Sequence, residues 1–326
     1  MIPNPPDTHY AISVTNPPAC VDLKPNVYEV EHQGVVGSCT AHAAIEALEA
    51  LRKEDYSRLY LYWQTRNGVQ NAPKQIGTNV RDTLRAAVHF GVPLEADWPY
   101  IEANVDEQPS DAVVLKAQER KLKRYERVPC VVMPAVLSAD ALHAYFKSAL
   151  AEGLPIVATM YIGTALYDLK GPWQTHSYTS ISAGGNPYLG MHAVLIIGYD
   201  DACQRYLIQN SWGPDYADGG FFGMPYSVAE TDIADAWVIR EFYDTAVPVP
   251  RPAQALEKIT LGLPYAQYKT NSMYYFDRPM VRIDTDDGTM VGMFALLGES
   301  VEIQYADLTA LVSKSPSGFS VQRKTP

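Results

Sequence analysis

The chain has 326 residues, of which 47% are hydrophobic and 19% charged, and a formal net charge of −11. This composition is typical of a globular protein large enough for one main domain and a smaller module. The acidic balance argues against nucleic acid or an anionic membrane surface as a partner. No stretch approaches the roughly 20 apolar residues of a membrane-spanning helix, so we expect no membrane insertion.

Residues 1–18 form a Pro-rich arm with little capacity to contribute to a core. The arm has neither the basic segment nor the apolar stretch of a signal peptide. We therefore expect either a cytoplasmic protein or a secreted one whose signal has been removed.

The most informative segment is residues 33–43, a glycine-containing loop that leads into helix-forming residues from Cys39 onward. Ser38 is expected to cap this helix. A helix N-terminus favours the thiolate, which is the nucleophilic form of cysteine. Gln33 is near enough in sequence to reach back toward Cys39. An isolated cysteine is more often a core residue, so a catalytic reading requires a base elsewhere in the chain.

Residues 39–103 are predicted to be mainly helical, and residues 139–152 another helix, followed by a strand at 155–161. Helices thus dominate early in the chain and strands late. The charged run 116–127 is expected to be a solvated face rather than a binding patch.

The apolar run 190–199 is predicted to be a buried strand with His192 near its beginning. A polar turn at Asp200-Asp201 leads to a second strand from Arg205, which ends near Asn210. Two strands joined by a turn would bring His192 and Asn210 to one end of a hairpin.

Residues 246–252 are predicted to be an extended, Pro-rich linker, and residues 253–326 a small β-rich module. Short alternating strands are expected within 259–263, 280–284 and 300–305. Residues 289–298 are expected to form a short helix.

Three separated blocks resemble, in the right order, the papain family of cysteine peptidases: residues 33–43, 192–199 and 210–213. A fourth block begins at residues 77–82 and resembles the stretch that runs alongside bound peptide in such enzymes. The resemblance covers residues 19–245. It implies an α+β, papain-like two-lobed fold, with a helical lobe, a β-barrel-like lobe and a cleft between them.

The resemblance also implies roles. Cys39 would be the nucleophile and His192 its acid/base partner, while Asn210 would orient His192. The Gln33 side chain and the Cys39 backbone N–H would form the oxyanion hole. The expected activity is hydrolysis of peptide bonds in a peptide or protein substrate, through an acyl-enzyme and without a cofactor or metal.

Four further residues would bind substrate by the same resemblance: Gly77, Thr78, Ala193 and Trp212. Trp212 would also shield the bond between His192 and Asn210 from water.

Two positions depart from the usual family pattern. Val36 and Thr40 stand where a cysteine and a tryptophan are usual, which is more typical of bacterial or viral branches. The absent cysteine removes a usual disulfide. With Cys39 free, the other three cysteines do not suggest a disulfide framework. They fit a reducing compartment or one bridge with a spare thiol, and we favour reduced thiols.

The remaining histidines carry weaker signals. His42, one turn after Cys39, is expected to be a packing residue, His176 a loop residue and His32 a residue of the cleft rim. No histidines or cysteines have metal-ligand spacing, so no metal site is expected.

Other readings stay open. A papain-like fold can also transfer acyl or peptidyl groups, or bind peptides without cleaving them. The C-terminal module weakly resembles the N-terminal, stalk-type domain of copper amine oxidases, and a β extension packed on the catalytic lobes is an equal alternative. The oligomeric state and side-chain specificity are not predicted.

Overall fold

The computed structural model describes residues 7–72, 77–130, 137–176, 178–183 and 186–242, and six strands between Lys258 and Lys324. The chain divides into two compact units, residues 1–245 and 246–326. The linker predicted at 246–252 lies outside the described residues.

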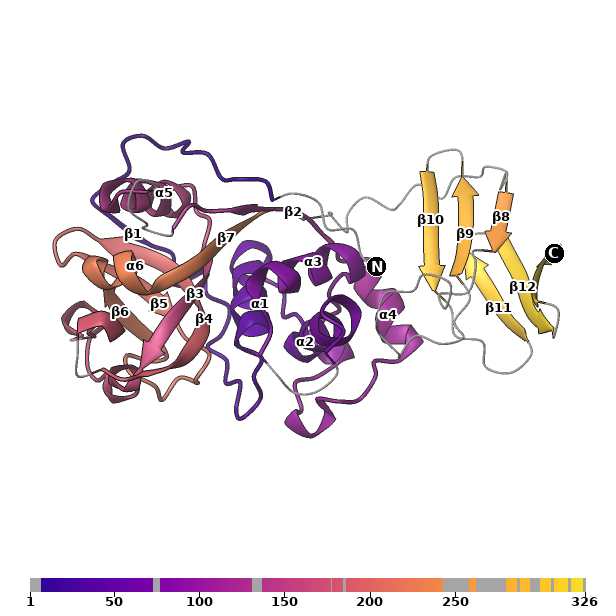
Figure 1. Cartoon of the computed structure of the whole chain (residues 1–326), viewed down its shortest axis with the longest axis horizontal. Helices are drawn as coiled ribbons and strands as arrows, with labels where there is room; N and C mark the ends of the chain where they lie inside the picture. The colour runs from indigo at the N-terminus through magenta and orange to yellow at the C-terminus, as the bar shows by residue number, and fades with distance from the viewer. Residues whose placement is uncertain are drawn as a thin grey trace. The chain divides into compact units, whose positions relative to one another are not determined.

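The first unit is built on an antiparallel sheet with the strand order β2-β7-β3-β4-β5-β6, and β1 pairs with β4 (Figure 1). The predicted strands at 155–161, at 190–199 and from Arg205 are confirmed. The strands are β1 (Cys20–Asp22), β2 (Leu122–Arg127), β3 (Ile156–Gly163), β4 (Tyr188–Asp200), β5 (Arg205–Gln209), β6 (Phe221–Pro225) and β7 (Ile233–Phe242).

Six α-helices of the described residues form two groups in Figure 1. The first group is α1 (Cys39–Arg52), α2 (Arg58–Gln64), α3 (Val80–Phe90) and α4 (Asp111–Gln118); the second, beside the barrel-like strands, is α5 (Ala139–Ala151) and α6 (Tyr226–Asp232). Short 3-10 turns lie at Lys24–Asn26, Glu95–Asp97, Glu102–Asn104, Thr164–Asp168, Trp173–Thr175 and Ile181–Ala183, and a π turn at Thr65–Val69. Within the described residues, every helix falls short of the length and apolar character that crossing a membrane requires.

Alternate residues of β3 and β4 face two different hydrophobic cores, because strand side chains have a period of two. Val157 and Leu195 pack with residues of α1, α2 and α3. Ala158 and Val194 pack with residues of α5 and α6. Both faces of these strands are therefore buried, which explains why β4 reads as a continuous apolar run.

α1 packs along β4, and this contact joins the two lobes. The helix is buried on almost every side from Thr40 to Ala50, so its alanine-rich sequence serves close packing as well as helix propensity. It ends at Arg52, and the following residue, Lys53, has left-handed backbone (φ 61°) and closes the last turn through its N–H to the Glu49 carbonyl.

The expected side-chain cap of α1 is wrong. Ser38 occupies the N-cap position, but its backbone (φ −100°, ψ 15°) is not the extended form that capping requires, and its side chain caps no N–H. The Ser38 hydroxyl instead contacts the Tyr100 hydroxyl (2.7 Å) and Nδ1 of His42 (3.2 Å).

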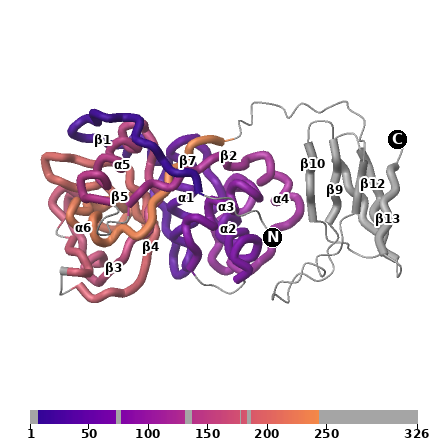
Figure 2. The backbone as a smooth tube through the Cα atoms, turned by 45° about the horizontal axis from the view of Figure 1, so that its top comes forward, coloured from indigo at the N-terminus to yellow at the C-terminus, as the bar shows by residue number. Residues whose placement is uncertain are grey.

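An N-terminal strap, residues 7–14, passes from the helical lobe to α5 (Figures 1 and 2). Asp7 pairs with Arg81 of α3, and Tyr10 bonds through its backbone N–H to the Arg127 carbonyl (2.9 Å) at the end of β2. The strap thus covers the end of an edge strand, which is otherwise open to pairing with another chain.

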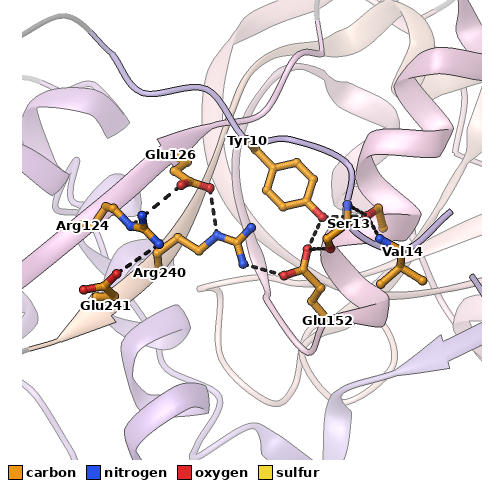
Figure 3. Close-up of polar contacts among 9 residues, drawn as sticks. Tyr10, Ser13, Val14, Arg124, Glu126, Glu152, Arg240 and Glu241 are labelled. Carbon is orange, nitrogen blue, oxygen red and sulfur yellow. Dashed lines mark hydrogen bonds and ion pairs between the residues drawn. The ribbon is translucent and has the colours of Figure 1, made fainter.

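The strap is held to α5 by side-chain hydrogen bonds (Figure 3). The Tyr10 hydroxyl and the Val14 N–H both meet the Ser148 hydroxyl, at 2.7 and 3.0 Å. Tyr10 and Ser13 also donate to the Glu152 carboxylate, which pairs on its other side with Arg240.

The second unit contains two three-stranded antiparallel sheets, with strand orders β10-β9-β8 and β11-β12-β13. Their strands are β8 (Lys258–Leu261), β9 (Met280–Thr285), β10 (Gly288–Met293), β11 (Ser300–Tyr305), β12 (Leu308–Ser315) and β13 (Gly318–Lys324). The helix expected at 289–298 is wrong over 289–293, because these residues pair with β9 in a hairpin whose cross-strand partners outweigh the local helix propensity. Residues 294–298 lie outside the described residues.

Candidate active site

Cys39 is the first residue of α1, so it stands at the helix N-terminus. The loop before it is fastened by Tyr100, whose hydroxyl donates to the Gln33 carbonyl (2.8 Å) and contacts the Ser38 hydroxyl (2.7 Å). The Val35 N–H donates to the Glu102 carboxylate (3.3 Å). The segment 100–102 therefore holds both ends of the loop that leads to the thiol.

His192 and Asn210 meet at the end of the β4–β5 hairpin, as the two predicted strands require. Leu195 lies opposite Gln209, so Asn210 directly follows the last paired residue. His192 Nε2 is 2.8 Å from the Asn210 side-chain oxygen. His192 is 5% exposed and Asn210 fully buried, so this hydrogen bond is screened little by water.

The Cys39 thiol and the His192 ring shift each other's pKa in opposite directions. Burial raises the pKa of Cys39, but the hydrogen bond and charge of His192, with the backbone N–H groups of Ala193 and Thr40, outweigh it and hold the pKa below its usual value. Burial lowers the pKa of His192, but Cys39 and then Asn210 outweigh it and raise that pKa. Each group therefore favours the charged form of the other.

Aromatic rings pack beside His192. The Trp212 ring centroid is 5.1 Å from that of His192, and the Tyr167 ring stacks on Trp212 at 4.8 Å. Tyr216 meets Trp212 edge to face at 5.0 Å. These three rings therefore place apolar surface beside the His192 ring.

Gln33 connects the loop before Cys39 to the β lobe. Its side-chain oxygen accepts a hydrogen bond from the Ser211 hydroxyl (2.7 Å), and its backbone N–H donates to the Ser211 carbonyl (2.9 Å). Its side-chain nitrogen donates to the Val36 carbonyl (3.0 Å). An amide nitrogen carries two hydrogens, so one N–H remains for another acceptor.

The other predicted site residues lie around the same point. Thr78 joins its hydroxyl to that of Thr40, the residue after the nucleophile candidate. A Cβ added at Gly37 would lie 3.6 Å from the Gly77 nitrogen, while one at Gly77 itself would meet open space. Ala193 is buried, and its backbone N–H points at the Cys39 sulfur.

The other histidines have structural contacts. His42 is fully buried, and burial lowers its pKa to about 3, so it stays neutral and packs edge to face on Tyr100. His176 is buried in its loop, between the Gly171 carbonyl (2.7 Å) and the Gly223 N–H (3.1 Å). His32 accepts from the Gly34 N–H (2.9 Å) and so shapes the loop near the site.

All four cysteines are free thiols. In the part of the chain that the structure describes, no group of three or more histidine, cysteine, aspartate or glutamate side chains is arranged to hold a metal ion.

Sequence reasoning missed two contributors: the Tyr100 hydroxyl and the Ser211 hydroxyl. Ala193 was predicted as a substrate-binding residue, without the contact that its N–H makes with the thiol. Ser211 adjoins Asn210, a predicted site residue, so proximity in sequence was the available signal. Tyr100 lies in the fourth resembling block, but its contact with the loop depends on how residues 95–105 fold back.

A model of the papain family of cysteine proteases matches residues 17–240 of the chain. The chain belongs to this family. The family match and the helices packed against an antiparallel sheet together show a papain-like α+β fold. The family match also identifies the chain as a thiol peptidase.

Known relatives of this papain-family protease include an uncharacterised peptidase C1-like protein of Acanthamoeba polyphaga mimivirus, 26% identical over 66% of this chain and 70% of the relative. Pro-cathepsin H of Medicago truncatula is 29% identical, over 61% of this chain and 53% of its own length. The chain thus spans about half to 70% of the length of these relatives. One of these relatives is thus a viral protein.

Among solved structures, xylellain, a cysteine protease from Xylella fastidiosa, is similar with a TM-score of 0.62 and 28% identity, over 72% of this chain and 91% of that one. Procathepsin L 3 of Tenebrio molitor shares the fold, with a TM-score of 0.52 and 17% identity over 71% of this chain and 72% of that one.

Proposed function

We propose that this protein hydrolyses peptide bonds with Cys39 as the nucleophile, His192 as acid and base, and Asn210 as the group that orients His192. The observation that carries the proposal is the series of contacts from the half-buried Cys39 thiol to the buried His192 and on to the Asn210 oxygen at 2.8 Å. Such a series supplies a thiolate, a proton donor beside it and a fixed ring orientation.

The proposed reaction begins with the Cys39 thiolate attacking the scissile carbonyl carbon. The developing oxyanion accepts hydrogen bonds from the Cys39 backbone N–H and the remaining side-chain N–H of Gln33, and each such donor contributes about 10²–10³ in rate. The protonated His192 then gives its proton to the leaving amine, and the C–N bond breaks to leave a thioester. His192, now neutral, takes a proton from water, which attacks the thioester and releases the acid.

We propose further that Gly77, Thr78, Ala193 and Trp212 contribute to substrate binding. The open space at Gly77 beside Gly37 supports close approach of a peptide backbone there. Ala193 contributes through its backbone, since its side chain is buried. Trp212 lies next to His192, with the two ring centroids 5.1 Å apart.

The test is labelling and cleavage by the full chain. An epoxysuccinyl inhibitor is expected to label the protein once, at Cys39, and Cys39→Ala should lose both labelling and hydrolysis of a peptide library. Cys203→Ala is the matched control, because burial raises the pKa of the Cys203 thiol and keeps it protonated. Folded wild-type protein that neither reacts nor cleaves would overturn the proposal.

The same experiment separates hydrolysis from the alternatives. A peptidyl transferase would label at Cys39 but yield mainly transfer product when an amine acceptor is present. A protein that binds peptides without cleaving them would retain a peptide unchanged after prolonged incubation.

For residues 253–326 we propose a separate binding or spacing module like the stalk-type domain of copper amine oxidases. The proposal is supported by the two three-stranded sheets and by the end of the family match at residue 240. Removal of residues 246–326 should leave the kcat for short peptides within about twofold. A large loss of kcat would favour a β extension that completes the catalytic unit.

A further inference from the structure

Arg58 is a buried arginine that the proposed reaction does not use. It is the first residue of α2, its side chain is 3% exposed, and its guanidinium lies among carboxyl groups from four segments of the chain. The distances are 2.8 Å to Glu31, 3.2 Å to Glu49, 3.4 Å to Asp55 and 3.2 Å to Glu95. A guanidinium carries several N–H donors in a fixed fork, so one arginine can hold several acceptors in one geometry.

Glu31 connects Arg58 to the proposed oxyanion donor, Gln33, which follows two residues later. The Glu31 carbonyl accepts a hydrogen bond from the Gly213 N–H (2.9 Å), and the Gln33 N–H donates to the Ser211 carbonyl (2.9 Å). This short segment is therefore bonded to the β lobe through its backbone and to Arg58 through the Glu31 carboxylate. A shift of that carboxylate would be passed to Gln33 through the backbone between them.

Glu95 connects Arg58 to the same loop by a second route. One oxygen of its carboxylate pairs with the guanidinium, and the other accepts a hydrogen bond from the Tyr100 N–H. The Tyr100 hydroxyl in turn donates to the Gln33 carbonyl (2.8 Å). Arg58 thus reaches Gln33 both through Glu31 and through Glu95 with Tyr100.

Glu49 joins the same guanidinium to α1, the helix that begins with Cys39. One oxygen of its carboxyl group accepts hydrogen bonds from Arg58 (3.2 Å) and from the Tyr56 N–H (3.2 Å). Burial raises the pKa of Glu49 to about 9, so at neutral pH it is protonated and accepts these bonds without a charge of its own. Arg58 is therefore fastened to the helix of the nucleophile as well as to the loop before it.

We propose that Arg58 is a positioning residue, which through Glu31 and Glu95 fixes the loop that presents the Gln33 side chain to the developing oxyanion. The inference rests on the proposed function, in which the remaining N–H of Gln33 is an oxyanion donor. Such a donor stabilises the transition state only when it is held in place beforehand, because its effect comes from preorganisation.

The test changes single partners of Arg58, because removal of the arginine itself would leave buried carboxyl groups without their cation. Glu31→Gln and Glu95→Gln keep the shape of each side chain and remove its charge. Each should lower kcat for a peptide about tenfold, a part of what one oxyanion donor contributes. KM should stay within about twofold, because the interaction lost is made only in the transition state.

Asp55→Asn is the matched control. It removes the same charge from beside the same guanidinium, but Asp55 lies in the loop between α1 and α2 and is 38% exposed. Its kcat should stay within about twofold of the wild-type value, as for a group that makes no transition-state contact. A loss as large as that of Glu31→Gln would overturn the proposal, because charge around Arg58 would then matter and the route to Gln33 would not.

Alkylation by iodoacetamide separates the position of the donor from the state of the thiol. The Cys39 thiolate forms an S–C bond and iodide leaves, so no oxyanion develops. The rate at Cys39, followed by mass spectrometry, should stay within about twofold in Glu31→Gln and Glu95→Gln, because it reports the thiolate alone. A parallel fall of alkylation and hydrolysis would contradict an action through Gln33.

A double-mutant cycle with Gln33→Ala tests the same route directly. Without the donor, adding Glu31→Gln should lower kcat by less than about twofold, since residues that act through one group are not additive. An undiminished loss in this background would show that Glu31 acts by another path and would overturn the proposal.

The wild-type protein keeps this inference separate from the proposed function. Peptide hydrolysis that depends on Cys39, with unchanged kcat in Glu31→Gln and Glu95→Gln, would overturn the role of Arg58 alone. If folded wild-type protein cleaves no peptide in a manner that depends on Cys39, the proposed function itself is wrong.

Discussion

Cys39 and His192 stabilise each other's charged form, and this sets the pH range in which both charges coexist. The pKa of Cys39 lies below its usual value and that of His192 above its usual value. We expect kcat/KM to rise as Cys39 loses its proton, to stay level while the pair is charged, and to fall as His192 loses its own proton. The acid and alkaline limbs of this pH profile report the titration of the coupled Cys39–His192 pair and not of either residue alone.

Asn210→Ala tests the geometry behind that profile. The variant removes a hydrogen bond that raises the pKa of His192, so the alkaline limb should move to lower pH and the maximal rate should drop at least about tenfold. Asn26→Ala, in a surface turn, is the control in the same pH–rate measurement. An alkaline limb that stays in place would contradict the role of Asn210.

Tyr100 is the second residue whose removal is informative. Tyr100→Phe deletes the hydroxyl that joins the Gln33 carbonyl to Ser38, so the loop that carries the oxyanion donors should loosen. We expect kcat to fall about tenfold with a smaller change in KM, and a stability loss of about 1–2 kcal/mol. Tyr145→Phe, on α5, should change neither quantity. Steady-state kinetics measure kcat and KM, and urea unfolding measures the change in stability.

At the scale of the element, α1 combines a reactive N-terminus with an interior that holds buried carboxyl groups. Burial raises the pKa of Glu46 to about 8, although the positive charge of Arg58 counteracts part of this effect. Glu46 is therefore protonated in the folded protein at neutral pH, whereas it is ionised in the unfolded chain.

Glu46→Gln tests this assignment through the pH dependence of stability. Between pH 4.5, the usual pKa, and about 8, only the folded state holds the Glu46 proton, so its contribution to stability is lost as pH rises through this window. Gln has no such loss. The variant should be more stable than the wild-type protein at pH 8 by on the order of 1–3 kcal/mol, and nearly equal at pH 4.

Urea unfolding at several pH values provides the measurement for Glu46. Glu119→Gln is the matched control, since Glu119 is 69% exposed and should leave the pH dependence unchanged. A Glu46→Gln curve parallel to that of the wild type would show that Glu46 ionises normally in the fold.

At the scale of the whole catalytic unit, the N-terminal strap ties the two lobes together away from the thiol. Tyr10 is 2% exposed and bonds to α5, while Asp7 pairs with α3. β1, which follows the strap, pairs with Gly198–Asp200, the end of β4 remote from His192. The strap is thus a structural element, and residues 7–14 contact neither Cys39 nor His192 through any described hydrogen bond.

Tyr10→Ala is expected to destabilise the unit by about 3–5 kcal/mol, because it removes a buried aromatic ring. Tyr10→Phe should cost about 1 kcal/mol, the usual contribution of one hydrogen bond. Both variants should keep the wild-type kcat at temperatures where they are folded. A rise in kcat on either substitution would instead indicate that the strap restrains the active site.

Several features could be predicted from sequence because their signals are local. Three local signals each predict one element: the apolar run of β4, the polar turn after it and the helix formers after Cys39. The spacing of the motifs predicts the order of the site residues along the chain. Ser38 and residues 289–293 were predicted wrongly because distant partners, Tyr100 and β9, outweigh their local preferences.

The sequence by itself determined which chemical groups this protein carries, in which order, and which segments become buried strands and helices, since these follow from residue type and period. Only the tertiary structure decided that Gln33 is tied to Ser211, that Tyr100 fastens the loop before Cys39, and that the exposed end of β4 stops at His192. Those contacts join residues far apart in the chain. Their geometry depends on how loops fold back and on the packing of α1 against β4, which no local pattern encodes.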